Sequence, residues 1–237
     1  MKKLIDIIEE EKTEKESIST EFKQFDKITQ DFKKSGLIYI AARPGMGKTT
    51  FEVNLAENIA KTGKKCAFFS LELSDEQLAE KFSTINSDME IYIDDTHTQT
   101  VSEIKQKILD LKNVDCVIID YLSLIAAETT YDNNLQGISK ISYQLKQMAK
   151  ELNMFVICTI QLPAYEGKPS LRYLMDSGAM VQDADVLMFL HRDKFTIENM
   201  DNCNSNITEL IIAKNRYGDI GTINLKYNSK TNQFTEI

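Results

Sequence analysis

The stretch Leu37-Ile38-Tyr39-Ile40-Ala41-Ala42-Arg43-Pro44-Gly45-Met46-Gly47-Lys48-Thr49-Thr50-Phe51 decides the fold of this 237-residue chain. Its apolar beginning predicts a strand, Leu37–Ala41, followed by a Gly-rich loop and a helix from about Thr49. In that context the loop matches a P-loop, in which backbone N–H groups and a helix N-terminus hold phosphates. The alternative is a chance Gly-rich turn, and Ala42 departs from the general pattern, which has Gly there. The residues expected to bind a nucleoside triphosphate are Arg43, Pro44, Gly45, Met46, Gly47, Lys48, Thr49 and Thr50.

Outward from the P-loop, short apolar runs alternate with amphipathic stretches, which is typical of strands and crossover helices in a mostly parallel sheet. A helix is predicted over Asn134–Leu152, where apolar residues recur every three or four positions. Shorter helices are expected after Ser74 and around Val101. Residues 217–221 predict a hairpin turn, so we expect the sheet to end antiparallel. The other predicted strands are Cys66–Ser70, Cys116–Asp120, Phe155–Ile160, Val186–Leu190, Glu209–Ala213 and Thr222–Tyr227.

Three polar residues at or just after strand ends complete the predicted site. A P-loop needs a second carboxylate beside its metal, and Asp120 ends an apolar strand where ligands collect in α/β sheets. We therefore expect Thr49 and Asp120 to hold Mg²⁺, although an acid there is often only a cap. Glu72 would face the γ-phosphate if its strand neighbours the P-loop strand; otherwise it caps the next helix. Gln161 is positioned to sense the γ-phosphate. The acidic pair Asp94-Asp95 forms a turn or a second metal site.

Composition restricts the function classes. The 28 Lys and Arg against 36 Asp and Glu give a net charge of −8, which argues against a protein that coats nucleic acid through a basic surface. No run approaches the roughly 18 apolar residues that span a bilayer, and no signal peptide is evident, so we expect a cytoplasmic protein without membrane contact. The four cysteines are expected to be buried free thiols.

The N-terminal segment has a character of its own. Of the first 34 residues, 17 are charged, and Leu4, Ile5 and Ile8 form a short apolar stripe at helical spacing. This pattern predicts a solvated helix with one adhesive end. The arm either packs on its own domain or docks on a neighbouring copy, and the residues alone leave both alternatives open.

Six stretches, taken together and in order, resemble the C-terminal RecA-like ATPase domain of DnaB-type replicative DNA helicases. The resemblance begins at about residue 18 and continues almost to the C-terminus, so we expect residues 18–237 to form this domain. The stretches are Ala41–Phe51, Phe69–Ser74, Ile93–Thr96, Ile119–Ile125, Ser177–Asp185 and Ala213–Gly218.

The resemblance implies a RecA-like P-loop fold, a homohexameric ring with ATP and Mg²⁺ between subunits, and translocation on single-stranded DNA. It assigns Glu72 as the catalytic glutamate and Gln161 as the γ-phosphate sensor. It also assigns Lys214 and Arg216 as the basic pair that reaches into the neighbour's ATP site, where an arginine finger stabilises transition-state charge. Residues 1–17 correspond to the family's linker helix, which favours docking on the adjacent subunit.

The sequence departs from the family in the segments expected to face DNA. Residues 122–139 contain no Lys or Arg, and only Lys168 and Arg172 remain as DNA-binding candidates in the segment after Gln161. The residues before 18 are too few for the N-terminal helical domain of full-length members. Because affinity scales with the phosphates neutralised, such loops imply weak binding unless a ring multiplies the contacts.

Two functional interpretations follow. The leading one is a minimal DnaB-like helicase motor that hydrolyses ATP to translocate on single-stranded DNA. The second is a helicase-like ATPase without unwinding activity, which acts as an adaptor or regulator of a host replication helicase, with a helicase, loader or primase as partner. An ATP-dependent recombinase or kinase on the same fold is a weaker third hypothesis.

Overall fold

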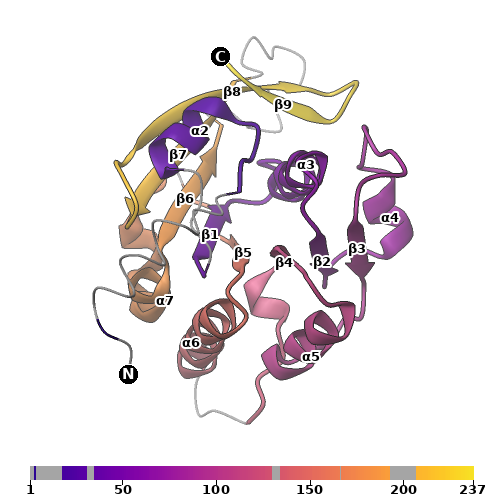
Figure 1. Cartoon of the computed structure of the whole chain (residues 1–237). Coiled ribbons are helices and arrows are strands. Elements are labelled where there is room, and N and C mark those ends of the chain that lie inside the picture. Colours follow the sequence, from indigo (N-terminus) through magenta and orange to yellow (C-terminus); the bar gives the residue numbers. More distant parts are fainter. Residues whose placement is uncertain (1–2, 4–17, 31–34, 130–133, 166, 193–206) are drawn as a thin grey trace.

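The computed structural model describes residue 3 and residues 18–30, 35–129, 134–165, 167–192 and 207–237. The predicted helix at residues 1–17, including Leu4, Ile5 and Ile8, therefore lies outside the described residues apart from Lys3. Figure 1 shows one sheet with helices on both faces and the C-terminal strands curving over one of them.

Within the described residues, nine strands form a single sheet in the order β3-β2-β4-β5-β1-β6-β7-β8-β9. The strands from β3 to β6 are parallel, and β7, β8 and β9 are antiparallel to their neighbours. The predicted α/β architecture, with a parallel sheet and an antiparallel C-terminal end, is confirmed. The strands are β1 (Leu37–Ala42), β2 (Cys66–Ser70), β3 (Ile91–Asp94), β4 (Cys116–Asp120), β5 (Phe155–Gln161), β6 (Val186–His191), β7 (Ile207–Asn215), β8 (Gly221–Asn228) and β9 (Gln233–Glu236).

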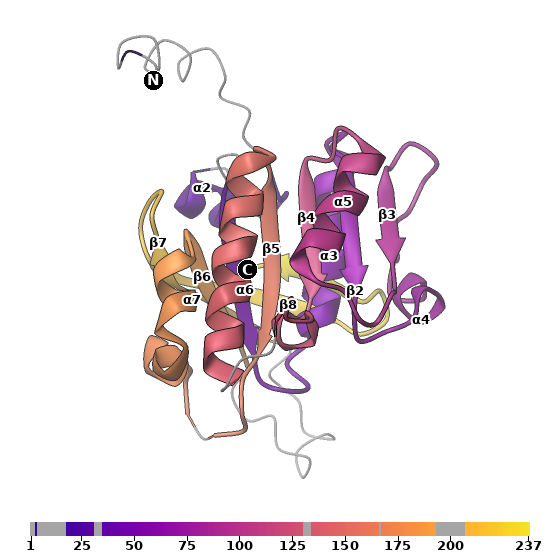
Figure 2. The same cartoon turned by 90° about the horizontal axis from the view of Figure 1, so that it is seen from below.

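The helices divide between the two faces of the sheet, as Figure 2 shows from below. Each face buries its own apolar cluster, one beneath α3 and the C-terminal strands and one beneath α5, α6 and α7. The helices are α2 (Lys23–Thr29), α3 (Lys48–Lys61), α4 (Asp75–Ala79), α5 (Val101–Leu111), α6 (Asn134–Glu151) and α7 (Gly178–Asp183), with 3₁₀ turns η1 (Leu122–Leu124) and η2 (Leu171–Ser177). None of the described helices is long and apolar enough to cross a membrane.

Strand burial explains which elements the sequence predicted. Every residue of β1, β2 and β4 is buried, because these strands are covered on both faces, and their sequences are apolar runs that end in Ser70 and Asp120 for β2 and β4. All predicted strands are present, with ends shifted by one or two residues. The edge strands β3 and β9 were not among them; each has four residues and is only partly buried.

Local capping fixes the two short helices that the sequence predicted. The hydroxyl of Ser74 accepts from Gln77 N while the Gln77 side chain accepts from Ser74 N, which is a capping box at the start of α4. Thr100 and Glu103 form the same motif at α5. Asp94 accepts from Thr96 N (3.0 Å) and from Lys107 Nζ (2.7 Å). It therefore belongs to the turn before α5, which was one of the two alternatives for the pair Asp94-Asp95.

The C-terminal strands lock onto the P-loop helix α3. The buried Asn54 side chain donates to Asn232 O (2.9 Å) and accepts from Phe234 N (2.7 Å). Phe234 then reaches the P-loop itself: a Cβ on Gly47 would lie 3.2 Å from its ring, and Gly47 has φ +89°. Only glycine adopts that conformation without strain, so both backbone and packing require it.

The predicted state of the cysteines is confirmed where they are described. Cys66, Cys116 and Cys158 are free and buried in the sheet, whereas Cys203 lies outside the described residues.

Candidate nucleotide-binding site

The P-loop connects the end of β1 to the start of α3. Gly45 and Gly47 both have positive φ, 78° and 89°, which lets the backbone fold tightly before the helix. Gly47 is the N-cap of α3 and has no side chain to cap it. The N–H groups of the first turn and the positive end of the helix dipole are therefore available to an anion.

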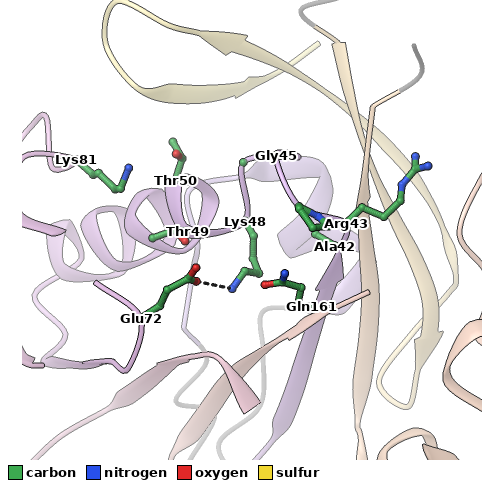
Figure 3. A pocket seen from close by; sticks show the side chains of 11 residues that line it. Ala42, Arg43, Gly45, Lys48, Thr49, Thr50, Glu72, Lys81 and Gln161 are labelled. Atoms are coloured by element: carbon green, nitrogen blue, oxygen red, sulfur yellow. Dashed lines mark ion pairs between the residues drawn. The ribbon is translucent and has the colours of Figure 1, made fainter. Parts of the chain in front are cut away.

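A cavity of about 340 Å³ opens over this loop and contains most of the predicted nucleotide-binding residues. Its walls come from the P-loop, from the segment after β2 and from the end of β5 (Figure 3). Met46 is not part of the wall, because its side chain is buried in the core beneath α3. The lining residues are Ala42, Arg43, Pro44, Gly45, Gly47, Lys48, Thr49, Thr50, Glu72, Lys81 and Gln161.

The Asp120 side chain contacts Lys48 and Thr49, two of the residues that line the cavity. The Lys48 ammonium forms an ion pair with Asp120 Oδ1, and the Thr49 hydroxyl donates to Asp120 Oδ2 (2.7 Å). Thr159 on β5 also donates to Asp120 (3.1 Å) and accepts from Lys48 (3.3 Å). Asp120 is fully buried. An alcohol and a carboxylate converging at this point form a set of hard oxygen donors that suits Mg²⁺.

A second buried acid, Glu52, lies beside this cluster and was missed by the sequence analysis. It is fully buried, close to Thr159 and Asp120. Burial raises the pKa of Glu52 well above its usual value, and the charge of Asp120 raises it further. Burial alone would lower the pKa of Lys48, but the carboxyls of Glu52 and Asp120 raise it above its ordinary value. The available signal was the spacing of Lys48 and Glu52, four residues apart on one helix face.

Glu72 enters the cavity by a route different from the one assumed. The condition stated for it, that its strand neighbours the P-loop strand, is not met, since β4 and β5 lie between β2 and β1. Nevertheless Glu72 Oε2 lies 3.9 Å from Lys48 Nζ, because the parallel strands all end at this edge of the sheet. Its side chain is 46% exposed, and Ser74 rather than Glu72 caps α4. Gln161 ends β5, which pairs directly with β1.

Lys81 is a further cavity residue that the sequence analysis did not select. It follows α4, and Glu57 of α3 fixes the chain just after it by accepting from Ser83 N and Thr84 N (3.0 Å for Thr84). In Figure 3 the Lys81 side chain extends toward the Thr50 end of the cavity. A short segment between two anchored elements thus holds a second cation near the predicted phosphate site.

Arg43 faces away from the other P-loop side chains (Figure 3). Its guanidinium donates to Tyr165 O, and it lies 3.0 Å from His191 Nδ1. It also sits 5.4 Å from the centre of the Tyr165 ring. Arg43 therefore lines the cavity with its stem and joins the P-loop to the segment after β5.

Lys214 and Arg216 lie beside the beginnings of β1 and β6, at the opposite ends of these strands from the cavity. Lys214 pairs with Leu187 on β6, and β6 in turn pairs with β1 at its beginning. The P-loop follows the other end of β1, four residues and about 13 Å of strand away. In one copy of the chain the basic pair therefore does not belong to the cavity.

The contacts of this basic pair are with the end of α7 and with Asp185. The Lys214 ammonium donates to Val181 O (2.6 Å) and Gln182 O (3.1 Å), which are carbonyls at the helix C-terminus. Arg216 donates to Gln182 O (2.7 Å) and pairs with Asp185 (3.4 Å). Burial and then the charge of Arg216 lower the pKa of Lys214 below its usual value.

The two DNA-binding candidates differ in their surroundings. Lys168 forms an ion pair with Glu209 on β7 (2.6 Å). Arg172 is exposed on η2. The sequence could not foresee the first, because Glu209 is 41 residues away.

The comparisons with known proteins agree with this geometry. The model of the DnaB-like helicase C terminal domain matches residues 17–90 and 81–236. The chain is 36% identical over 258 residues to the "Replicative DNA helicase DnaB" of Geobacillus stearothermophilus, covering 93% of this chain and 56% of that protein. The identity and both coverages are the same for the "Replicative DNA helicase DnaC" of Bacillus subtilis. The chain thus spans about half the length of the curated relatives it matches.

Two solved structures show the same fold. One is an ATPase domain, which superposes with a TM-score of 0.86 at 28% identity and covers 99% of this chain and 97% of that one. The other is a DnaB-like replicative helicase, whose structural study also describes its interactions with primase. It superposes with a TM-score of 0.84 at 29% identity and covers 98% of this chain and 67% of that one. The predicted RecA-like fold is therefore confirmed. Its P-loop, its strand-end carboxylates and these matches together show that the chain belongs to the DnaB-like helicase C-terminal domain family.

Proposed function

We propose that this chain is the ATP-hydrolysing motor of a DnaB-type replicative helicase, which translocates on single-stranded DNA as a ring, most simply a homohexamer. The observation that carries the proposal is the position of two groups of predicted site residues at opposite ends of the strands. Lys48, Thr49 and Asp120 cluster at the P-loop end, while Lys214 and Arg216 lie at the other. In this proposal the site becomes complete where the basic pair of one copy meets the cavity of the next.

In this proposal, ATP binds with its phosphates on the P-loop backbone and the start of α3. Thr49 and Asp120 hold Mg²⁺, which would supply positive charge to the phosphate oxygens. Lys48 leaves Asp120 for the phosphates, a short movement because the ammonium already lies at the base of the cavity. Breaking that ion pair also removes one cation from Asp120 Oδ1, which makes room for the metal.

Glu72 is proposed to orient the attacking water and to accept its proton. Its partial exposure and its position 3.9 Å from Lys48 support this role, because the carboxylate faces the part of the cavity where the γ-phosphate would lie. Gln161 senses that phosphate from the adjoining strand end. Arg216 of the neighbouring copy stabilises charge in the transition state, with Lys214 beside it.

A second function is favoured by one specific observation. Lys168 is neutralised by Glu209, and residues 122–139 carry no basic side chain, so the predicted DNA-facing segments carry little positive charge. This supports an ATPase that acts on a host replication protein, such as a helicase, loader or primase, in place of DNA. Either role would be performed in the cytoplasm.

Steady-state ATP hydrolysis at low salt, with and without single-stranded DNA, separates the two functions. Stimulation by DNA that is lost in Glu72→Gln and Arg216→Ala supports the motor. Hydrolysis that ignores DNA but still requires Arg216 supports the adaptor.

Mixing two inactive variants tests whether the site is shared between copies. Lys48→Ala destroys the P-loop of its own copy, and Arg216→Ala destroys the contribution to the neighbour. In an equal mixture, half of the copies keep the P-loop and half of their neighbours keep Arg216, so about a quarter of the interfaces are complete. We expect hydrolysis to return to the mixture. If the mixture stays as inactive as its components, the shared site is refuted.

A further inference from the structure

Two tyrosines form a tight stack in the segment that follows β5. The ring centroids of Tyr165 and Tyr173 lie 3.6 Å apart and the ring planes are inclined by only 4°. The Arg43 guanidinium sits 5.4 Å from the centre of the Tyr165 ring. The spacing between the rings is close to the roughly 3.4 Å rise between successive bases of a nucleic acid strand. A base added to the stack would therefore continue it at its natural spacing.

Tyr173 is the exposed end of this stack. It is 42% exposed, although Tyr165 stacks against one face of its ring. A tyrosine that is exposed and supported from behind by a second aromatic ring suits a planar partner, because aromatic rings favour offset stacking.

The stack is anchored on both sides of the segment. Arg43 of the P-loop donates to Tyr165 O and lies beside His191 of β6, which fixes the Tyr165 end. At the other end, Tyr173 N donates to Ser170 O (3.0 Å), and the next residue, Leu174, is buried. A platform held in this way loses little conformational entropy when a ligand binds.

The charges around the stack favour recognition through bases rather than through phosphates alone. Lys168 is paired with Glu209, and the segment after β4, which leaves the sheet beside the segment after β5, has no basic residue in 122–139. Arg172, next to Tyr173, is exposed and can meet one phosphate. Aromatic stacking adds affinity for single strands without needing further charge and tolerates every base.

We propose that the outer face of Tyr173 is a stacking site for an unpaired base of single-stranded DNA, with Tyr165 and Arg43 as its support. The inference rests on the proposed function only in requiring that the chain meets single-stranded DNA. It assigns the affinity of this segment mainly to a base, so removal of the bases weakens binding even when all phosphates remain.

The test compares oligothymidylate with an abasic phosphodiester of the same length, using the full chain and a non-hydrolysable ATP analogue. We expect the wild-type chain to bind oligothymidylate about tenfold more tightly, and the preference to persist as salt is raised, because stacking releases no counterions. Tyr173→Ala should lose the preference, and Tyr173→Phe should keep it. Tyr143→Ala, which removes another exposed tyrosine, on α6, is the matched control and should keep it.

A spectroscopic readout reports stacking directly. The chain contains no tryptophan, so Tyr173→Trp introduces a single reporter whose fluorescence oligothymidylate should quench and the abasic strand should not. Equal affinity of the wild type for both strands, or a preference that survives in Tyr173→Ala, overturns the stacking site while leaving the motor intact. Binding of neither strand overturns the proposed DNA track and the stacking site together.

Discussion

Replacing Lys146 by methionine should destabilise the chain strongly, because it leaves a buried carboxylate without its main counter-ion. The Lys146 and Asp185 side chains are 11% and 5% exposed and form an ion pair between α6 and the start of β6. Removal of one partner of a buried pair typically costs about 3–5 kcal/mol. In the Lys146→Met variant Asp185 would still accept a hydrogen bond from Leu37 N (2.7 Å) and would still pair with the half-exposed Arg216 (3.4 Å). We therefore expect the lower end of that range, about 3 kcal/mol.

The double variant Lys146→Met/Asp185→Asn separates the pair from simple loss of packing. The introduced asparagine can still accept from Leu37 N, and the introduced methionine fills the space of the lysine stem, so no buried charge remains. We expect the double variant to cost about 2–3 kcal/mol less than the sum of the single variants.

Urea unfolding followed by far-UV circular dichroism measures these costs, since the chain has no tryptophan to report on unfolding. The pair lies at the start of β1, away from the cavity, so the folded variants should bind nucleotide as the wild type does. Additivity of the two single costs within about 0.5 kcal/mol would refute the reasoning.

Two further predictions concern the cavity. Burial raises the pKa of Glu52 in the folded chain above its unfolded value of 4.5, so folding favours the protonated carboxyl. This contribution to the free energy of unfolding is complete below pH 4.5 and is lost as the pH rises toward the pKa of the folded state. Glu52→Gln should therefore gain stability over the wild type as pH rises above 4.5, and a urea midpoint difference that stays the same between mildly acidic and mildly alkaline buffer would contradict this. Lys81→Ala should weaken nucleotide binding about fivefold, since Lys81 lines the cavity and a partly exposed charged contact with phosphate contributes roughly 1 kcal/mol. Titration with a fluorescent nucleotide checks this prediction. Lys81→Arg should keep the affinity, and Lys61→Ala, which removes an exposed lysine elsewhere, is the control for the change in net charge. Equal weakening in the two alanine variants would show a general charge effect and contradict the prediction.

The P-loop and the buried strands could be predicted because their signals are contiguous in the sequence. Residues 43–50 lie together on the chain, and β1, β2 and β4 are apolar up to the Ser70 and Asp120 that end β2 and β4, because both of their faces are covered. The edge strands β3 and β9 have one neighbour each and shorter, partly exposed sequences, so the same signal is weak in them.

The candidate site was predicted less completely, because several of its contacts join distant segments. Glu72 was expected in the site if β2 adjoined β1, and through the family resemblance; β2 does not adjoin β1, yet Glu72 does reach Lys48. Lys81 enters the cavity because Glu57 anchors the segment after it. Lys168 was predicted to bind DNA, and the sequence did not show that it pairs with Glu209.

The sequence by itself determined the local chemistry of this protein: a phosphate-binding loop between a strand and a helix, and the acids and amide that end its strands. It could do so because a tight glycine turn and a helix N-terminus depend on neighbouring residues alone. Only the tertiary structure decided which of those side chains meet. The order and register of the strands bring Asp120 and Glu72 to Lys48 and carry Arg216 to the far end of the sheet. Strand order arises from crossovers and from burial of both sheet faces, which join residues far apart in the chain.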